Sequence, residues 1–279
     1  MKTLVTGGSG YLGTHVRRHF DADDLSRRSG FNILDSQDAA MVAEYDLIIH
    51  LAASLDKSPD AADEVFLTNV EGTINVLKNV RKDAALIFAS TKDVYGRFAD
   101  NFSEVTEDCP TMYSGQSALE WSKLIAEKYV EYYAHQNRFR ACIFRLSTVY
   151  APLSEGNTPN IVGFLADAIN SGEAIRFPGS GKPVRDFLHV DDLASACEAF
   201  HESVIRHGLY NLGGGSANAI TLRGLLEKLE EVSGLQAVID ETPLPDPVPF
   251  NYISALGRID QELAWRPSIN LDAGLRTLF

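Results

Sequence analysis

The sequence is poor in cysteine and in basic residues, and each shortage excludes a class of protein. Its three cysteines, Cys109, Cys142 and Cys197, lack the paired spacing of metal sites, and their odd number predicts reduced thiols in the cytoplasm. There are 25 Lys and Arg residues against 38 Asp and Glu, which gives a formal net charge of −13. This acidic balance argues against nucleic acid or an anionic membrane as the main partner, because both attract basic surfaces.

Long apolar runs are also missing. The longest such stretch, at residues 46–54, has about half the length of a membrane-spanning helix. The first residues do not combine a charged segment with an apolar run, so no secretory signal is predicted and we expect a cytoplasmic protein. The 45% of apolar residues and 23% of charged residues are instead typical of a globular chain with a buried core.

Short apolar runs alternate with helix-like segments through the first two-thirds of the chain. The apolar runs predict buried strands because polar and apolar residues do not alternate in them. The predicted strands are Lys2–Thr6, Leu47–Leu51, Leu86–Ala89 and Ala141–Leu146. The predicted helices between them are Gly13–Phe20, Gln37–Glu44, Val65–Arg81 and Ser117–His135. This order predicts an α/β fold with a doubly wound parallel sheet, in which ligands bind beyond the carboxyl ends of the strands.

The pattern changes after residue 150. Ala151–Thr158 is typical of a loop, Ile161–Asn170 predicts an apolar helix, and Phe177–Pro183 has the glycine and proline content of turns. The prolines of Thr242–Pro249 exclude a central strand or helix and indicate a stiff linker. We therefore expect a smaller and less regular C-terminal lobe.

A glycine-rich segment follows the first predicted strand and opens the first helix. In it, Gly7, Gly10 and Gly13 have a spacing that is a variant of the dinucleotide-binding fingerprint. Glycine there allows a tight turn, close approach of the backbone to a pyrophosphate and close helix–strand packing, while the helix N-terminus supplies N–H donors. An ordinary turn is the plainer alternative. The position between a buried strand and a helix favours dinucleotide binding.

Two alternatives concern the adenosine ribose of such a ligand. In the first, Asp35 accepts the 2′-hydroxyl of NAD, because it lies 22 residues beyond Gly13, near the expected interval. In the second, Asp21–Leu25 is a short second strand, and Arg27 and Arg28 after it bind the 2′-phosphate of NADP.

The second alternative has further consequences. It makes Phe31–Leu34 the third strand and places Asp35 near the adenine. The plainer interpretation of the two arginines is that they lie in a solvated loop. If they bind the ligand, their guanidinium groups favour NADP over NAD.

Sequence motifs along nearly the whole chain follow the order of a known family. They are Thr6–Gly13, His50–Ala53, Asn69–Leu77, Ala89–Gly96, Ser122–Lys123 with Glu127, Arg145–Pro152, Arg185–Asp192, Asn211–Gly215 and Trp265–Pro267. With these motifs the chain resembles the extended short-chain dehydrogenase/reductase family of nucleotide-sugar epimerases, dehydratases and reductases. It departs from the family pattern at Ala151, where glycine is usual.

The resemblance implies a Rossmann domain that binds NAD or NADP and a smaller lobe that binds a nucleotide-sugar. The first would comprise residues 1–150, to which 184–215 return, and the second residues 151–183 and 216–279. A homodimer formed partly through the helix of Lys123 is also implied.

The same resemblance assigns roles to individual residues. Besides Arg27 and Asp35, the implied cofactor-binding residues are Gly7, Gly10, Tyr11, Leu12, Gly13, Leu51, Ala52, Ala53, Asn69 and Lys123. Thr91 and Thr148 are implied substrate contacts, and Arg185 is implied to clamp a diphosphate, with an ion pair to Asp186 or Asp191 as the alternative. His50 has a buried core position as its plainer interpretation. Because His189 has no carboxylate or cysteine at metal-ligand spacing, no metal is expected.

The acid/base group of the family is absent. The family uses a Tyr-x-x-x-Lys pair with a Ser or Thr, in which the lysine lowers the pKa of a tyrosine on the same helix face. Lys123 and Thr91 are present as catalytic candidates, but Leu119 stands four residues before Lys123. Leucine has no titratable proton.

Three explanations follow from this departure. Glu120, Tyr95 or Tyr113 replaces the tyrosine; or Thr91 and bound water are sufficient for the step; or the protein binds NAD(P) without turnover, as a sensor or binding module. The apolar stripe to which Leu119 belongs predicts that Lys123 points inward. The favoured function is an NAD(P)-dependent oxidoreductase or epimerase acting on a nucleotide-sugar or a related hydroxylated substrate.

Overall fold

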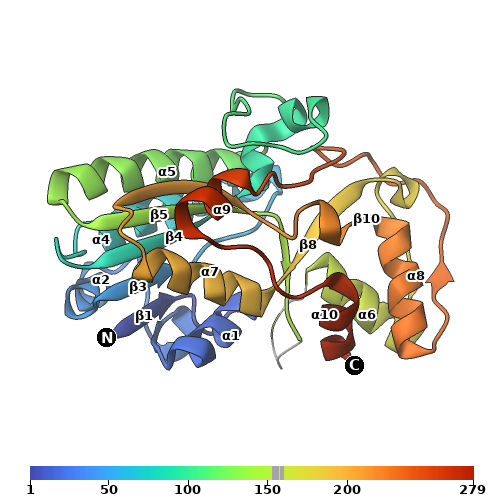
Figure 1. The fold of residues 1–279 in the computed structure, drawn as a ribbon, viewed down its shortest axis with the longest axis horizontal. Coiled ribbons are helices and arrows are strands. Elements are labelled where there is room, and N and C mark those ends of the chain that lie inside the picture. The colour runs from blue at the N-terminus through green and yellow to red at the C-terminus, as the bar shows by residue number, and fades with distance from the viewer. Residues whose placement is uncertain (153–156, 158–159) are drawn as a thin grey trace.

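A six-stranded parallel sheet forms the centre of the computed structural model, which describes residues 1–152, 157 and 160–279 (Figure 1). The strand order is β2-β1-β3-β4-β5-β9. The strands are β1 (Thr3–Thr6), β2 (Asp23–Leu25), β3 (Leu47–His50), β4 (Ala85–Thr91), β5 (Arg140–Leu146) and β9 (His207–Leu212). The four strands predicted from apolar runs are confirmed, with ends shifted by one or two residues.

Helices cover both faces of this sheet (Figure 1). Because successive side chains of a strand point to opposite faces, Val5 and Ile49 pack toward α1 and α7, while Leu4 and Ile48 pack toward α4 and α5. Burial on both faces explains why the strands are apolar at nearly every position. The helices of this part are α1 (Tyr11–Phe20), α2 (Ser36–Ala40), α3 (Ala62–Phe66), α4 (Gly72–Leu77), α5 (Ala118–Asn137) and α7 (Val190–Glu202).

A smaller part of the chain packs beside the carboxyl ends of the large sheet. It contains a three-stranded sheet, β10-β8-β6, and a two-stranded sheet, β11-β7, with a core formed by α6, α8 and α10. Its strands are β6 (Thr148–Tyr150), β7 (Ala174–Ile175), β8 (Val184–His189), β10 (Ala219–Thr221) and β11 (Val238–Ile239). The remaining helices are α6 (Ile161–Ser171), α8 (Leu222–Ser233), α9 (Gly257–Leu263) and α10 (Leu271–Leu275).

Two predictions require correction. Phe31–Leu34 does not form a strand, because the Asn32 side chain accepts a hydrogen bond from the Leu34 amide at 3.0 Å and closes a local turn. The helix expected at Val65–Arg81 begins earlier, at Ala62, passes through a π-helical turn at Leu67–Glu71 and ends at Leu77. The loop expected at Ala151–Thr158 lies largely outside the described residues.

Chain topology determines where a ligand can enter. After β2 on one side of β1, the chain crosses to β3 on the other side, so the strand order reverses at β1. In open parallel sheets the crevice at the carboxyl ends of two such strands is the usual ligand site. Across the described ranges, no helix is both long enough and apolar enough to cross a membrane.

Candidate functional site

The glycine-rich segment after β1 turns so tightly that side chains would not fit at two of its positions. Gly7 has a φ of +73°, and a Cβ atom there would lie 2.8 Å from the backbone nitrogen of Ala52. A Cβ atom on Gly13 would overlap the carbonyl oxygen of Gly7. The Gly10 amide donates to that same oxygen at 2.9 Å. Strand, glycine turn and helix thus follow one another as the spacing predicts.

The start of α1 is open to an anion. Its N-cap is Gly10, which has no side chain to accept from the N–H groups of the first turn, and that turn contains no acidic residue. The positive end of the helix dipole therefore lacks a compensating charge on its own helix. A pyrophosphate fits these conditions, because its oxygens accept the N–H groups that a helix start leaves free.

Residues after β3 lie against this turn. The Leu51 amide donates to the Thr6 carbonyl oxygen at 3.1 Å, and the Ala52 amide lies 3.3 Å from Thr6 Oγ1. Tyr11 points elsewhere: its hydroxyl donates to the Ala151 carbonyl oxygen at 2.7 Å and accepts from the Ala151 amide at 2.8 Å. Five of the predicted cofactor residues lie together at the turn: Gly7, Gly10, Gly13, Leu51 and Ala52. Ala53 is next in the chain, whereas Leu12 packs against the core.

A carboxylate that sequence reasoning missed also borders the turn. The Asp24 side chain is 4% exposed, and its Oδ2 accepts from Ser26 at 2.9 Å and from Ser9. Its Oδ1 is buried without a hydrogen-bond partner among the described residues, and a Cβ atom on Gly8 would lie 2.6 Å from it. A buried acceptor of this kind needs a donor, and a ligand hydroxyl at the turn would provide one. The signal for Asp24 in the sequence is its acidic side chain within Asp21–Leu25, the alternative second strand.

The short second strand is confirmed as β2, which pairs with β1 in parallel. Arg27 and Arg28 follow it in an exposed turn, and Arg28 Nη1 donates to the carbonyl oxygen of Ser9 at 3.0 Å. Asp35 instead caps the N-terminus of α2, where its carboxylate accepts from backbone amides of the first turn. Arg28 therefore contacts the glycine-rich segment, whereas Asp35 is engaged by its own helix.

Lys123 points inward from α5, as the apolar stripe predicts. It is 4% exposed, and its Nζ donates to the Ala89 carbonyl oxygen at 2.7 Å. Burial lowers the pKa of Lys123 to about 8, an effect that the negative charge of Glu127 opposes. Thr91 ends β4 two residues beyond Ala89, and its hydroxyl oxygen accepts from the amide of Asp93 at 3.2 Å.

The tyrosines considered as substitutes for the missing acid/base have different surroundings. Leu119 is buried one turn before Lys123 on α5. Tyr95 is enclosed in the core, where its hydroxyl donates to Asn211 Oδ1 at 2.6 Å and accepts from Arg145 at 3.0 Å, and burial raises its pKa to about 12. Tyr113 is 71% exposed on a loop. Tyr95 is thus a packing residue, and the Tyr113 side chain faces solvent.

Glu120 has two structural partners. It closes a capping box with Ser117 at the start of α5, accepting from the Ser117 amide at 2.6 Å. It also pairs with Lys57 Nζ at 2.7 Å. Its carboxylate is therefore held by the helix start and by a cation.

Asn69 lies in the π-helical turn and uses both ends of its amide within the protein. Its Nδ2 donates to the Ser54 carbonyl oxygen at 3.0 Å and to Ser122 Oγ at 2.8 Å, and its Oδ1 accepts from the Ser54 amide at 2.8 Å. It therefore holds the segment after β3 against α5. A part of Asn69 in binding the cofactor stays a prediction.

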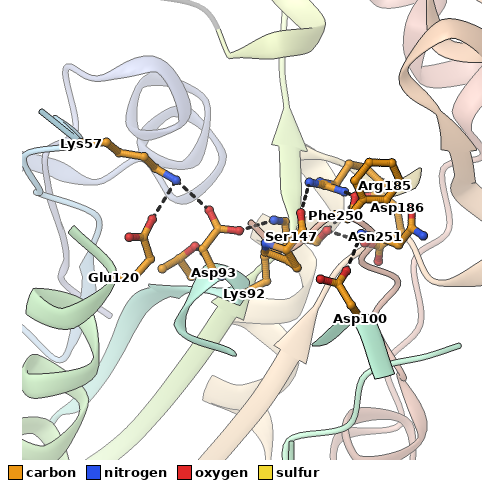
Figure 2. Close-up of polar contacts among 12 residues, drawn as sticks. Lys57, Lys92, Asp93, Asp100, Glu120, Ser147, Arg185, Asp186, Phe250 and Asn251 are labelled. Atoms are coloured by element: carbon orange, nitrogen blue, oxygen red, sulfur yellow. Dashed lines mark hydrogen bonds and ion pairs between the residues drawn. The ribbon is translucent and has the colours of Figure 1, made fainter. Parts of the chain in front are cut away.

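Two of the three predicted substrate contacts lie in the three-stranded sheet, Thr148 in β6 and Arg185 in β8. Arg185 is 8% exposed, and its guanidinium donates to the carbonyl oxygens of Pro249 and Phe250, each at 2.7 Å (Figure 2). The alternative ion pair with a neighbouring aspartate is not among the described contacts. The side chain thus anchors the C-terminal segment beside β8, and its clamping of a diphosphate stays a prediction.

His50 is a satisfied core residue. Its two ring nitrogens contact the hydroxyls of Thr6 and Thr73, and burial, with the charge of Lys123, lowers its pKa to about 3. The imidazole is consequently neutral. In the part of the chain that the structure describes, no group of three or more His, Cys, Asp or Glu side chains could hold a metal ion.

Known proteins are similar to this chain in sequence and fold. The sequence model of the NAD dependent epimerase/dehydratase family matches residues 3–213. CDP-paratose 2-epimerase of Salmonella typhi is 25% identical, over 100% of this chain and 98% of that protein. The dTDP-glucose 4,6-dehydratase DesIV of Streptomyces venezuelae, solved with NAD, has a TM-score of 0.87 at 22% identity, over 100% and 95% of the two chains. RMD of Pseudomonas aeruginosa, complexed with NADPH, has a TM-score of 0.84 at 20% identity, over 100% and 97%.

Proposed function

The chain belongs to the NAD dependent epimerase/dehydratase family, and on this premise we propose that it is an NAD(P)-dependent oxidoreductase or epimerase of a nucleotide-sugar or a related hydroxylated substrate. The observation that carries the proposal is the uncapped start of α1 above a turn that accepts only glycine at Gly7 and Gly13. The name of the Salmonella relative specifies a nucleotide-linked sugar, and the two solved neighbours hold NAD and NADPH, which supports a nicotinamide cofactor.

The residues of the site have separate tasks in this proposal. The start of α1 holds the diphosphate of the cofactor. Asp24 accepts a hydrogen bond from the adenosine ribose, and Lys123 donates one to the nicotinamide ribose. Bound NAD(P) supplies a hydride acceptor or donor at a carbon that bears a hydroxyl group. Because Thr91 Oγ1 accepts from the Asp93 amide, its own proton stays available for a hydrogen bond to the reacting substrate oxygen.

The remaining assignments are part of the same proposal. Residues 1–150, with 184–215 returning, bind the cofactor, and residues 151–183 and 216–279 bind the nucleotide-sugar. Trp121, Tyr129 and Tyr132 are exposed along α5, which supports a homodimer formed through that helix.

We propose NAD as the cofactor, against the NADP that the two arginines favour. The free Oδ1 of Asp24 would accept a 2′-hydroxyl, whereas its negative charge would repel a 2′-phosphate. We expect NAD⁺ to bind at least about tenfold more tightly than NADP⁺ in calorimetry, since a hydrogen bond to a buried charge is worth roughly that much. Asp24→Asn should narrow this preference, and Asp35→Ala should leave it unchanged. Tighter binding of NADP⁺ that disappears in Arg27→Ala would reverse the assignment.

Turnover tests the function itself. Purified protein is expected to bind NADH, seen by energy transfer from tryptophan, and to convert at least one member of a panel of UDP-, dTDP-, CDP- and GDP-sugars. Leu119 favours a second function, a cofactor-binding protein without turnover. Conversion that appears only in Leu119→Tyr would establish this second function in place of the first. Failure to bind either nicotinamide nucleotide would reject both.

A further inference from the structure

Four charged side chains form a row of ion pairs between β4 and α5 (Figure 2). Glu120 Oε1 lies 2.7 Å from Lys57 Nζ, and Lys57 Nζ lies 3.1 Å from Asp93 Oδ2. The second oxygen of Asp93 contacts Lys92 Nζ. Each member thus meets the next, and Lys92 is the cation at the far end of the row from Glu120.

Most of this row is removed from water. The side chains of Lys92 and Glu120 are 8% and 4% exposed and that of Asp93 is 19% exposed, while Lys57 is 53% exposed. Burial of charged groups carries a large desolvation cost, and packed apolar residues are often at least as stabilising as a buried ion pair. Stability therefore does not by itself explain a buried lysine here.

In the sequence, the residue at each end of the row follows a position of the family's catalytic pattern. Lys92 directly follows Thr91 at the carboxyl end of β4, where ligands of parallel sheets bind. Glu120 directly follows Leu119, which takes the place of the expected tyrosine. The row consequently connects the strand end that presents Thr91 with the helix start that lacks a phenol.

The groups that face Lys92 come from several elements. Asp93 attracts its charge, while Arg185 of β8 and Lys57 of the segment after β3 repel it, and its Nζ lies 5.2 Å from the ring centre of Tyr252. Burial, together with the two repelling cations, lowers the pKa of Lys92, and Asp93 opposes the change. A lysine in such surroundings releases and accepts a proton closer to neutral pH than an exposed lysine does.

We propose that Lys92 performs the proton transfer at the substrate hydroxyl beside Thr91 that the missing phenol would otherwise perform, an inference that rests on the proposed function. The O–H bond of the substrate breaks, an N–H bond forms on the neutral Nζ, and the electron pair of the O–H bond stays on the oxygen. In the reverse direction the ammonium group returns the proton. Asp93 stabilises the ammonium group, and Thr91 donates a hydrogen bond to the same substrate oxygen.

Two variants with a matched control test this role on a substrate that the wild type converts. Lys92→Met removes the amino group that would carry the proton. Lys92→Arg keeps a positive charge, but a guanidinium does not release a proton in proteins. Both are expected to lose about 10²–10⁴-fold in kcat with unchanged NADH binding. The control is Lys2→Met. Like Lys92, Lys2 pairs with a carboxylate (Glu44, at 2.9 Å) and lies near a tyrosine ring (Tyr45, 4.4 Å from its centre). Because Lys2 is at the amino end of the sheet, its loss should leave kcat unchanged. Adding Leu119→Tyr to Lys92→Met should restore part of the lost kcat.

A second measurement needs neither cofactor nor substrate. Protein labelled with ¹⁵N-lysine gives one Nζ signal for each lysine in NMR, and the signal that is absent in Lys92→Met belongs to Lys92. The chemical shift of this signal is followed as the pH rises. We expect the midpoint of Lys92 below 10.5, the usual pKa of a lysine, and still lower in Asp93→Asn, because that variant loses the stabilising negative charge. The titration thus decides the state of Lys92 even if no sugar of the panel is converted.

The outcomes separate this inference from the proposed function. Unchanged kcat in Lys92→Met, full kcat in Lys92→Arg, or a Lys92 midpoint at or above the usual lysine value of 10.5 would each overturn the role of Lys92 while the proposed function stands. Failure of the wild type to bind either nicotinamide nucleotide would reject the proposed function itself.

Discussion

Lys123→Met is expected to lose about 10²–10⁴-fold in kcat, the usual effect of removing a positioned catalytic side chain, while the fold near pH 7 is at least as stable as in the wild type. The ammonium group is buried, and methionine fills a similar volume without any need for solvation. The lost hydrogen bond to the Ala89 carbonyl oxygen offsets part of this gain. Turnover of a converted nucleotide-sugar and urea unfolding measure the two effects. A variant that retains kcat would contradict the assigned role.

The stability difference between the wild type and Lys123→Met should depend on pH. The pKa of Lys123 is about 8 in the folded protein, below its usual value of 10.5. Between these values the folded protein has released the proton and the unfolded chain still holds it, so wild-type stability rises with pH. Below pH 8 both states hold the proton and the cost of the buried charge is fully present. Relative to the wild type, the variant should therefore be most stable near pH 7 and lose this advantage toward pH 9.5. An advantage that grows with pH would contradict the burial of this charge.

Arg145→Met is expected to lower the free energy of unfolding by about 3–5 kcal/mol. The guanidinium of Arg145 meets both oxygens of Glu127, with Nε at 3.0 Å from Oε1 and Nη2 at 2.7 Å from Oε2. Methionine would leave this carboxylate, which is 0% exposed, with Ser90 as its remaining described donor. An unpaired charge at such a position is among the most destabilising changes known. Urea denaturation at pH 7 measures the loss.

The control for Arg145→Met lies on the same helix as Glu127. Lys128→Met breaks the pair between Lys128 and Glu131, whose atoms are 3.1 Å apart and whose side chains are 62% and 45% exposed. Water and salt screen such a pair, so we expect a loss below about 1 kcal/mol. Combining Arg145→Met with Glu127→Leu should recover part of the larger loss, because the carboxylate that the guanidinium pairs with is then removed as well. Similar losses in the two single variants would show that burial does not determine the cost.

The central sheet could be predicted because its strands are covered on both faces. An apolar residue is then required at nearly every position, as in Leu47–His50, and a continuous run becomes visible in the sequence. The glycine-rich segment was equally visible, since steric exclusion at Gly7 and Gly13 restricts those positions to one residue type. The inward direction of Lys123 followed from helical periodicity. Local constraints thus made these features predictable.

The remaining features depend on contacts between distant segments. β2 has only three residues, so its pattern did not reveal which side chain faces the glycine turn, and Asp24 was missed in favour of Asp35. The row that ends at Lys92 joins residues from three separate segments, which no spacing in the sequence connects. The bonds of Arg185 to Pro249 and Phe250 are likewise formed only by the folded chain. Side-chain partners, unlike strands, were therefore not predictable.

Two side chains near the start of α1 fasten the chain where it leaves β6. The Tyr11 hydroxyl bonds to both backbone polar atoms of Ala151, and His15 Nε2 lies 2.9 Å from the Pro152 carbonyl oxygen. The backbone at Ala151 and Pro152 is thus held by the same helix turn that we propose for the diphosphate. Helix α1 therefore ties the proposed diphosphate site to the start of the segment that we propose binds the sugar.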